Sequence, residues 1–343
     1  MICMFSIEDN TKWDNIVSGF ANYDVYYLSG YVKAFRIHGD GDPYLLYYEG
    51  PGLRAIYVYM KRKTALDGVY DAITPYGYGG VLFEGETTED GLRAFWQEYT
   101  ALMAQEHIVD NFVRYHPVLK NAIPMKHISS VTDLGKTISF DLVSPEVIWE
   151  NIISKNRNMI RKAEKNGIVI EHGQGMELLD EFMRIYNATM EKDEAEEYYF
   201  FKRAFYESIH NDLRNNYEIF YARYEGKIIA SSIMIFANGR MNYHLSGSVT
   251  EYRNLAPSNL LLYKAALWGY EQGFKTFHLG GGVGSGMDGL YKFKAAFNKN
   301  SDYQFSIGRE IFDQATYDQL VDIRRKTDPD FDDQSSFFPR YRA

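Results

Sequence analysis

The stretch YEIFYARYEGKIIASSIMIFANGRMNYHLSGS, residues 217–248, decides the fold of this chain. It contains three runs of apolar and β-branched residues, separated by Glu225-Gly226 and by Asn238-Gly239. Runs of this composition form strands, and such dipeptides form the tight turns of β-hairpins. The stretch therefore predicts three antiparallel strands joined by two hairpin turns.

A crossover unit is expected after these strands. A helix that is apolar on nearly all sides runs from Pro257, which suits a first helical turn, to Gly273, which suits the position just past a helix end. A strand over 276–282 ends in a glycine-rich loop, a second helix covers 288–298, and a last strand covers 303–312. Antiparallel hairpins followed by a β-α-β crossover predict a mixed α/β sheet.

Four runs within this region resemble a known family. HLSGS, R-x-L-x-P-x-N-LLLY, FHLGGG and D-x-LYKFKAAFN are similar to the C-terminal domain of the FemABX group, and the element order resembles the second half of a GNAT acyltransferase domain. That family has two GNAT-like domains in tandem and transfers aminoacyl groups from charged tRNA to amines of peptidoglycan precursors. The resemblance implies an α/β fold of two tandem GNAT-like (acyl-CoA N-acyltransferase-like) domains with mixed sheets.

The first half of the chain repeats this order of elements. Strands over 43–50 and 53–63 form a hairpin, a glycine-broken extended stretch covers 70–83, and an amphipathic helix over 88–106 precedes a strand over 108–116. One order of elements present twice predicts an internal duplication. This prediction depends on element order and does not use the resemblance.

The division between the halves is expected near Ser144. Ser144-Pro145 is a helix start, and one helix is predicted to continue from there to Lys165. We therefore expect residues 1–143 to form an N-terminal and residues 144–343 a C-terminal GNAT-like domain. The predicted buried stripe of the helix comprises Ile148, Trp149, Ile152, Ile153, Met159, Ile160 and Ala163.

Composition limits the class of protein. The 343 residues carry a net charge of −9; residues 1–142 hold 12 Lys and Arg against 18 Asp and Glu, and the remainder holds 25 against 28. The acidic balance extends over both halves and excludes an overall basic surface for DNA. The single cysteine, Cys3, excludes an internal disulfide and fits a reducing compartment. No apolar run reaches the ~18 residues of a membrane span, so a cytoplasmic protein without a transmembrane segment is expected.

Three residues are catalytic candidates. Acyl transfer to an amine needs positioned donors for an oxyanion and a protonated leaving group. In GNAT folds the strand that corresponds to residues 241–248 faces the acyl donor, so the resemblance implies a role for Ser246. Asp288 and Lys294 flank the glycine-rich loop, and the resemblance gives Asp288 the role of orienting the incoming amine. The alternative role of Asp288, given equal weight, is to cap the helix that follows.

Phosphate-binding and substrate-binding candidates surround these residues. Arg157 and Arg161 belong to a basic cluster on the helix after Ser144, and Asn259 ends RNLAPSN (253–259), where CoA-dependent GNATs carry a glycine-rich phosphate loop. RNLAPSN contains no glycine, but a helix N-terminus presents free N–H groups to an anion. The simpler interpretation of the arginines is a solvated face that complements the helix dipole. Substrate-binding candidates in this half are Tyr243, Arg253 and Tyr291.

The acceptor candidates lie in the first half. PYGYGG (75–80) places three glycines in an extended stretch, which suggests that its backbone approaches something closely. In the FemABX family the corresponding cleft receives the acceptor. Tyr76, Tyr78, Arg114 and His116 are therefore candidate contacts, although Tyr and His side chains also serve simply as packing residues.

The donor stays open between two chemistries. No His and Cys spacing indicates zinc and no dinucleotide motif is present, so we expect neither a metal nor a tightly bound cofactor. The acidic segment EKDEAEEYYFF (191–201) is either a loop that attracts a cationic amine or a solvated loop. FemA-type members have a long helical hairpin here that is thought to engage tRNA, whereas this chain has a short connection. We therefore retain both aminoacyl-tRNA and acyl-CoA as donors.

Three functions are consistent with the sequence. The first is a FemABX-type N-acyltransferase that moves an acyl or aminoacyl group onto an amine of a cell-envelope precursor of the peptidoglycan type. We expect direct transfer, because no activated nucleophile is apparent. The second is an acyl-CoA-dependent N-acyltransferase that acts on an amino sugar or small amine. The third is a non-catalytic duplicated module that binds the acceptor.

Overall fold

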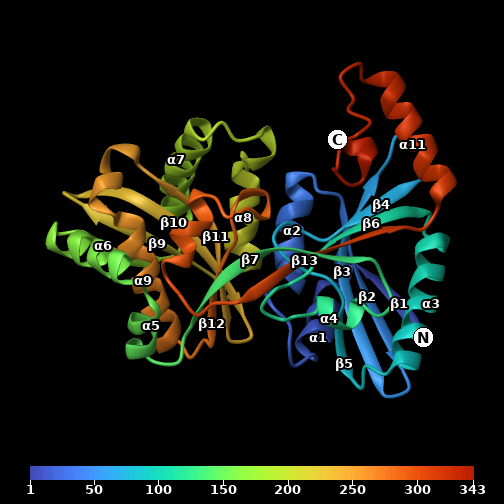
Figure 1. Ribbon diagram of the computed structural model, residues 1–343, viewed down its shortest axis with the longest axis horizontal. Helices are drawn as coiled ribbons and strands as arrows, with labels where there is room; N and C mark the ends of the chain where they lie inside the picture. The colour runs from blue at the N-terminus through green and yellow to red at the C-terminus, as the bar shows by residue number, and fades with distance from the viewer. The chain divides into compact units, whose positions relative to one another are not determined.

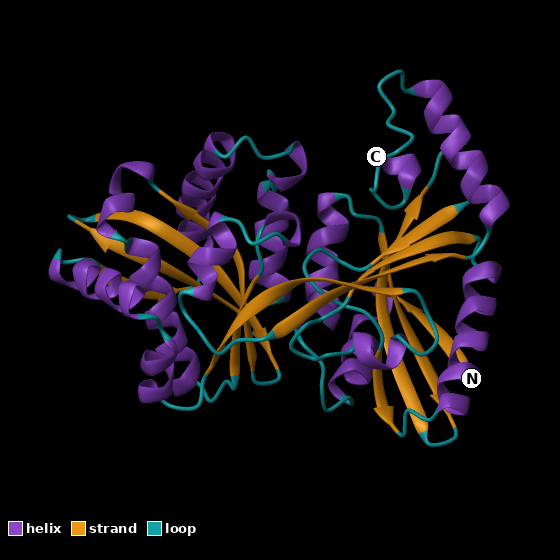
Figure 2. Ribbon diagram, viewed as in Figure 1, coloured by secondary structure: helices purple, strands orange, loops and turns teal.

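The structure, a computed structural model, describes residues 1–343 and divides them into two compact units. The first unit comprises Met1–Leu134 and Phe305–Ala343, and the second comprises Gly135–Gln304. Each unit combines a β-sheet with helices (Figure 2), which confirms the mixed α/β class. No helix has the length and apolar character needed to cross a membrane.

The units differ from the expected division at residue 144. The last strand, β13 (Tyr303–Ile311), pairs with β6 (Ile108–Arg114) through partners such as Ile307 and Arg114, so the chain after residue 304 returns to the first unit. The strand before the expected boundary, β7 (Val131–Asp141), pairs through residues 138–141 with β12 of the second unit. Strand pairing between distant parts of the chain therefore fixes the two units.

The sheet of the second unit has the strand order β7-β12-β11-β10-β9-β8. Only β11 and β12 run parallel in this order, and the other neighbours are antiparallel. The two predicted hairpins are confirmed, because Glu225, Gly226, Asn238 and Gly239 all have positive φ, as the favoured two-residue hairpin turns require. Besides β7, its elements are α5 (Pro145–Asn151), α6 (Ser154–Lys165), β8 (Val169–Gly173), α7 (Met176–Lys192), α8 (Arg203–Asp212), β9 (Tyr217–Tyr224), β10 (Lys227–Ala237), β11 (Arg240–Ser248), α9 (Pro257–Glu271), β12 (Thr276–Gly280) and α10 (Gly289–Ala295), as labelled in Figure 1.

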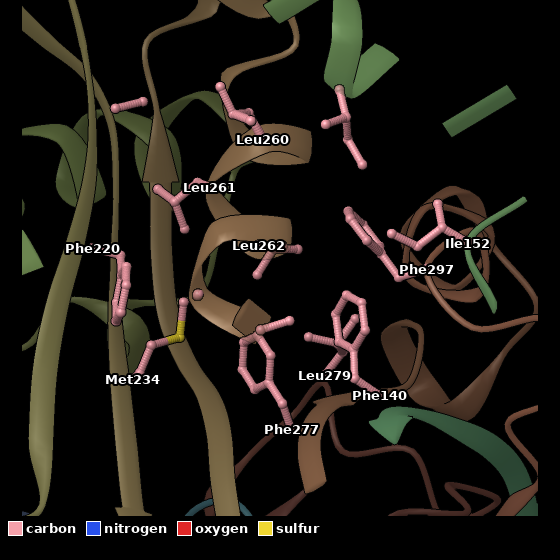
Figure 3. Packing of buried hydrophobic residues seen from close by; sticks show 14 of the residues in the cluster. Phe140, Ile152, Phe220, Met234, Leu260, Leu261, Leu262, Phe277, Leu279 and Phe297 are labelled. Carbon is pink, nitrogen blue, oxygen red and sulfur yellow. The ribbon is translucent and has the colours of Figure 1, made fainter. Parts of the chain in front are cut away.

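Helix α9 lies in the core of the second unit. Its consecutive residues Leu260, Leu261 and Leu262 are all buried, which confirms a helix that is apolar nearly all round. Figure 3 shows these leucines beside an aromatic pair, Phe140 and Phe277, whose rings stack with centroids 5.6 Å apart. Because several faces of α9 are covered, the helix holds the sheet, α5 and α6 in one hydrophobic cluster.

The predicted single helix from Ser144 to Lys165 is wrong in one respect, because it is broken at Ile152 and Ile153. Both residues have extended backbone, and the Ile153 N–H donates to the carbonyl of Ala296, 3.1 Å away. Ile153 is 37% exposed and therefore does not belong to the buried stripe, whereas Ile148 and Ile152 are fully buried. The break is caused by a distant partner at the end of α10.

The first unit has the strand order β1-β2-β3-β4-β6-β13, with β5 pairing with β3. A second sheet with the same succession of hairpin, glycine-rich stretch, helix and strand confirms the tandem arrangement predicted from the sequence. Besides β6 and β13, its elements are β1 (Ile2–Ser6), α1 (Asn10–Ser18), a 3-10 turn (Val25–Tyr27), α2 (Ser29–His38), β2 (Asp42–Gly50), β3 (Leu53–Lys63), β4 (Tyr70–Ile73), β5 (Leu82–Gly85), α3 (Glu89–Gln105), α4 (Ala122–Met125), α11 (Gln314–Thr327) and a last 3-10 turn, η6 (Arg340–Arg342).

Candidate functional site

Strands β11 and β12 separate from each other in the middle of the second unit. They pair in parallel from Arg240 and Thr276 to Asn242 and His278, and the pairing then stops. Beyond this point β11 continues to Ser248, while β12 remains paired with β7. The backbone groups of β11 after Asn242 are thus not used by β12, so this edge of the strand can present N–H and C=O groups to a ligand.

A cluster of three hydroxyl groups follows the point of separation. The Ser232 Oγ on β10 donates to the Ser246 Oγ on β11 at 2.8 Å. Burial raises the pKa of the Tyr243 hydroxyl, and hydrogen bonds from Ser246 and Ser232 oppose this rise. The structure therefore brings the predicted residues Ser246 and Tyr243 together and adds Ser232.

A β-bulge at His244 puts these side chains on one face. Ile233 is opposite Leu245 and Met234 is opposite Tyr243, so His244 is the extra residue of β11. A bulge of one residue reverses the alternation of side chains along the strand, which places Tyr243 and Ser246 on the same side. Burial lowers the pKa of the His244 imidazole to about 3, so this side chain is neutral at physiological pH.

Lys294 on α10 is the one buried lysine of the second unit. Its side chain is 8% exposed, and its Nζ donates to the carbonyl oxygen of Gly281, at the end of β12, at 2.8 Å. Burial lowers the pKa of the Lys294 ammonium to about 8, and the nearby Asp288 carboxylate opposes this shift. No carboxylate lies within ion-pair distance of Lys294, so its direct partner is a neutral carbonyl and Asp288 acts on it only at longer range.

Asp288 is the cap of α10, the alternative role considered from the sequence. Its Oδ1 accepts the N–H of Tyr291 at 2.8 Å, and its Oδ2 accepts the N–H of Val283 at 3.1 Å. These two backbone hydrogen bonds hold the pKa of the Asp288 carboxyl below its usual range. The carboxylate therefore closes the glycine-rich loop onto the helix. A Cβ on Gly282 would lie 2.4 Å from the Asp288 Oδ1, so glycine is required there.

The start of α9 has polar residues that are already engaged in part. The Asn259 Nδ2 donates to the Asn156 Oδ1 on α6 at 2.7 Å, and Asn156 in turn donates to the carbonyl of Ala296. The predicted phosphate-binding residue Asn259 thus connects two helices. Arg253 is exposed and makes no hydrogen bond or ion pair through its side chain, which leaves it available to a ligand. Ala256 has a φ of 60°, a conformation that non-glycine residues adopt at some cost.

Arg157 and Arg161 lie on the outer face of α6, beside Trp149. Their guanidinium carbons lie 5.9 and 5.1 Å from the centre of the Trp149 ring, respectively. Neither arginine forms an ion pair, and Arg161 is exposed. The arrangement holds two positive charges on one aromatic surface, and the Arg161 Nη1 donates to the Asn158 Oδ1 at 3.3 Å.

The four acceptor candidates come together in the first unit. The rings of Tyr78 and His116 lie 5.7 Å apart, and the Arg114 Nε donates to the carbonyl of Gly77 at 3.0 Å. Tyr76 stacks on Phe35 at 5.6 Å. Burial raises the pKa of the Tyr78 hydroxyl, and the positive charge of Arg114 opposes this.

His116 is a core residue of this cluster. It is 1% exposed, and its Nε2 is 2.9 Å from the Oδ2 of Asp24, which is also fully buried. His116 has no surface to offer a substrate in this conformation. Tyr76, Tyr78 and Arg114 are each partly exposed and remain the accessible members of the cluster.

The glycines of PYGYGG have an explanation within the protein. A Cβ on Gly77 would lie 2.5 Å from the ring of Tyr26, and a Cβ on Gly80 would lie 2.6 Å from the ring of Tyr115. Both glycines also have positive φ. The predicted close approach is therefore confirmed, and tyrosine rings of the same unit make it at Gly77 and Gly80.

A cavity of about 600 Å³ lies elsewhere in the second unit. Its charged lining residues are paired in part, since Arg184 bonds Glu181 and Arg223 bonds Glu171. None of the predicted site residues lines it. The lining residues are Glu181, Arg184, Arg223, Gly226, Lys227, Ile228, Ile229, Val249, Glu251 and Tyr252. Because its lining carries both positive and negative charges and includes no candidate residue, we assign no chemistry to this cavity.

Two residues of the site were missed from the sequence, and one of them left a signal. Ser232 belongs to a pair of serines in the otherwise apolar strand KIIASSIMIF, and buried hydroxyls in such a strand need partners. Asn156 is 3% exposed and fixes Asn259, but nothing near it in the sequence distinguishes it from a surface asparagine. No group of three or more His, Cys, Asp or Glu side chains is placed to hold a metal ion.

Comparisons with known proteins identify the fold and one domain. Residues 153–295 match the family model described as an acetyltransferase (GNAT) domain. FemX, at 15% identity, superposes with a TM-score of 0.69 over 92% of this chain and 99% of its own. The C-terminal domain of a putative lysylphosphatidylglycerol synthetase from Agrobacterium fabrum, at 16% identity, gives 0.58 over 92% and 93%. No curated protein matches the sequence.

A third solved structure has the tandem arrangement in its description. The tandem GNAT protein from the clavulanic acid biosynthesis pathway, at 9% identity, superposes with a TM-score of 0.50 over 91% of this chain and 98% of its own. Similarities at this level of identity establish the fold, while the matched domain adds the class of chemistry. The chain therefore has a tandem GNAT fold that is similar to that of FemX, and residues 153–295 form a GNAT domain, which supports acyl transfer as the activity.

Proposed function

We propose that the chain is an N-acyltransferase of FemABX type that transfers an aminoacyl or acyl group to an amine of a cell-envelope precursor of the peptidoglycan type. The observation that carries this proposal is the buried ammonium of Lys294, which has a carbonyl partner and no carboxylate in contact, within the segment that matches the GNAT domain. A buried charge without a counter-ion in contact destabilises the folded state. We therefore infer that the charge is kept for its function.

The oxyanion of the transfer reaction supplies that role. When a neutral amine attacks the donor carbonyl, its oxygen becomes negatively charged, and a positioned cation in a site shielded from water stabilises this charge strongly. The Lys294 ammonium has three N–H donors and uses one on Gly281. With a pKa of about 8 it is mostly protonated at pH 7. Lys294 would thus bind the oxyanion, and Asp288, with lone pairs beyond its two capping bonds, would orient the amine.

The separated edge of β11 would hold the donor. In this proposal its backbone groups bind the acyl chain, and the hydroxyls of Ser246 and Tyr243 contact the leaving group. Ser246 would relay to the leaving group the proton that the attacking amine loses, so the serine itself stays neutral. Tyr291 and Arg253 would contact the substrates near the loop and the start of α9. Arg157, Arg161 and the α9 end near Asn259 would attract the phosphates of the donor, since unpaired guanidinium groups suit phosphate.

The first unit would recognise the acceptor. Tyr76, Tyr78 and Arg114 are partly exposed and combine aromatic surface with a positive charge, which suits a precursor that carries phosphate or carboxylate groups. His116 would support this surface from behind through its contact with Tyr78. Charged tRNA and activated precursors are both cytoplasmic, so we place the reaction in the cytoplasm, with no tightly bound cofactor.

The alternative donor is acyl-CoA, with an amino sugar or small amine as acceptor. The match to an acetyltransferase domain favours this alternative. The same residues would act in both cases, because the oxyanion forms in both. The two donors differ in the size of the leaving group, so an experiment with each of them separates the alternatives.

Mass spectrometry of reaction mixtures tests the proposal. Three reactions are compared. The purified protein is mixed with a muropeptide precursor and charged tRNA, with the same precursor and acetyl-CoA, and with small amines and acetyl-CoA. A mass increment on the acceptor that is lost in Lys294→Ala and retained in Lys292→Ala would support it. Lys292 is the matched control, because it lies on the same helix, is exposed and forms no ion pair. Binding of the precursor without transfer from any donor would instead support a non-catalytic module.

A further inference from the structure

Residues 314–343, from α11 to η6, cover part of the first unit and are called the C-terminal strap below. Tyr317, Leu320 and Val321 of the strap form a hydrophobic cluster with Val109 of β6. Tyr341 belongs to the same cluster, but its hydroxyl reaches past it to two buried carboxyl groups. That hydroxyl lies 2.5 Å from the Asp110 Oδ2 on β6 and 3.0 Å from the Asp71 Oδ2 on β4.

We propose that the strap is held by a proton-dependent latch, in which the Tyr341 hydroxyl bridges a protonated Asp110 and an ionised Asp71. Asp71 has two cationic partners, because Arg62 of β3 and Arg342 of the strap both donate to it. Asp110 has none within contact. Its Oδ1 is buried and has no hydrogen-bond partner, and its Oδ2 has only Tyr341.

The Tyr341 hydroxyl has a single hydrogen, and this determines whether Asp110 must be protonated. A tyrosine hydroxyl has one proton to donate, so it can serve one of the two carboxyl groups as a donor. If Asp110 is protonated, its own O–H donates to the Tyr341 oxygen, and Tyr341 donates onward to Asp71. If Asp110 is ionised, the Tyr341 hydroxyl can donate to only one of the two carboxylates. The second carboxylate then lies against the lone pairs of the Tyr341 oxygen. Only the protonated form of Asp110 satisfies both contacts.

The electrostatic surroundings agree with this assignment. Burial raises the pKa of the Asp110 carboxyl to about 7, and the negative charge of Asp71 adds to the rise. The hydrogen bond from Tyr341 and the positive charges of Arg62 and Arg342 oppose it. These are the charged groups that face Asp110 from β3, β4 and η6. Arg342 also donates to the carbonyl of Lys63 at 2.7 Å and so fixes the end of the strap to β3.

The sign of the pH dependence follows from proton uptake. An Asp exposed by release of the strap titrates near its ordinary value of ~3.9, whereas Asp110 under the strap holds its proton up to about pH 7. Docking of the strap therefore takes up a proton between these values, and raising the pH weakens docking. The latch is fully closed below about pH 3.9, weakens as the pH rises toward 7, and contributes nothing further above that value. The docking equilibrium is expected to fall by up to about tenfold per pH unit in this range.

Hydrogen–deuterium exchange of the full-length protein tests the latch without any ligand. Peptides from the strap are followed between pH 5.5 and 8.5, with correction for the intrinsic exchange rate, and peptides from β10 of the second unit serve as the internal reference. In the wild type, the protection of the strap should fall toward pH 7 and then level off. Protection that is constant over this range would overturn the proposal.

Three variants separate the latch from general loosening. Asp110→Asn keeps a neutral donor toward Tyr341, so strap protection should lose its pH dependence. Tyr341→Phe removes the bridge and should leave the strap weakly protected at every pH. Asp318→Asn is the matched control, since Asp318 is an exposed carboxylate on α11, and it should behave as the wild type.

A direct titration covers the case in which Asp110→Asn fails to fold. Carboxyl ¹³C resonances of the wild-type protein report the ionisation of each Asp. A transition of Asp110 above pH 5.5 would support the latch, whereas ionisation of Asp110 below pH 5, or an Asp110→Asn strap that loses protection as the wild type does, would overturn it.

Discussion

Replacement of Lys294 by methionine should reduce activity and raise the stability of the second unit at pH 7. Methionine has a similar length and shape without the charge. A pKa lowered from 10.5 to about 8 means that folding disfavours the charged form by about 3 kcal/mol. Loss of the hydrogen bond to the Gly281 carbonyl lowers the free energy of unfolding by about 1–3 kcal/mol, because that carbonyl is left without this partner. The net gain is expected to lie between about 0 and 2 kcal/mol.

The pH profile separates this effect from ordinary packing. Lys294 is charged in the folded protein below pH 8 and in the unfolded chain below about pH 10.5, so the unfolded state binds more protons between these values. The stability of the wild type should therefore rise from pH 8 to pH 10.5, and that of Lys294→Met should not rise from this cause. Activity at pH 7 should fall by about 10²–10³ in kcat, as expected when one oxyanion donor is removed.

Two measurements check the prediction. Hydrogen exchange of peptides from α9 and β10 reports the stability of the second unit by itself, which is preferable to one unfolding curve for a protein of two units. The transfer assay gives kcat and KM. A Lys294→Met protein that is less stable than the wild type at pH 7 by more than about 1 kcal/mol, with an unchanged slope between pH 8 and 10, would show that Lys294 is a structural residue.

Three further changes have defined outcomes. Gly247→Ala should destabilise the second unit by about 1–3 kcal/mol in chemical denaturation, because a Cβ there would lie 2.8 Å from the Cα of Tyr186 on α7. Ser232→Ala and Ser246→Ala should couple by about 0.5–1.5 kcal/mol in a double-mutant cycle on kcat/KM, since the two hydroxyls bond each other; additive effects would place Ser232 outside the site. His116→Ala should cost about 3 kcal/mol of stability in the first unit by hydrogen exchange, because Asp24 would be left buried without its imidazole partner, and a loss near zero would show that other groups satisfy Asp24.

The elements that could be predicted from the sequence are those with local causes. Both hairpins of the second unit follow from two-residue turns whose φ values are positive, and Asn, Glu and Gly at these positions indicate the turns directly. Helix α9 was predicted because consecutive leucines and few charges are enough to bury a helix. The tandem arrangement was predicted because the order of elements is repeated, even though the copies differ in sequence.

The errors have causes that lie far away in the chain. The helix after Ser144 breaks at Ile153 because its N–H bonds the carbonyl of Ala296, and no residue near the break signals this partner. The glycines of PYGYGG predicted a close approach without its partner, because the rings of Tyr26 and Tyr115 come from other segments of the first unit. Local sequence indicated that a close approach exists, and only the fold shows what approaches.

The sequence predicted which residues belong to the candidate site better than it predicted what each of them does. Asp288, Lys294, Ser246 and Tyr243 were all named from the sequence, and the structure places them in two groups, around the glycine-rich loop and on β11. Burial is the property that the sequence did not provide. Lys292 and Lys294 are two residues apart on α10 and equally basic, yet only Lys294 is enclosed.

The buried charges of the whole chain argue for the function of Lys294. Asp24 has His116 as its partner, and Asp71 has two arginines. Asp110 is neutral under the assignment made for the latch. Each of these groups is compensated by its own unit, whereas Lys294 has only a carbonyl dipole in contact and a carboxylate at longer range. In the proposed reaction, the oxyanion formed on the substrate would bring a negative charge into contact with Lys294. A stable tetrahedral anion, such as a phosphonate analogue of the transfer intermediate, should bind more tightly than the planar substrate, and this preference should disappear in Lys294→Met.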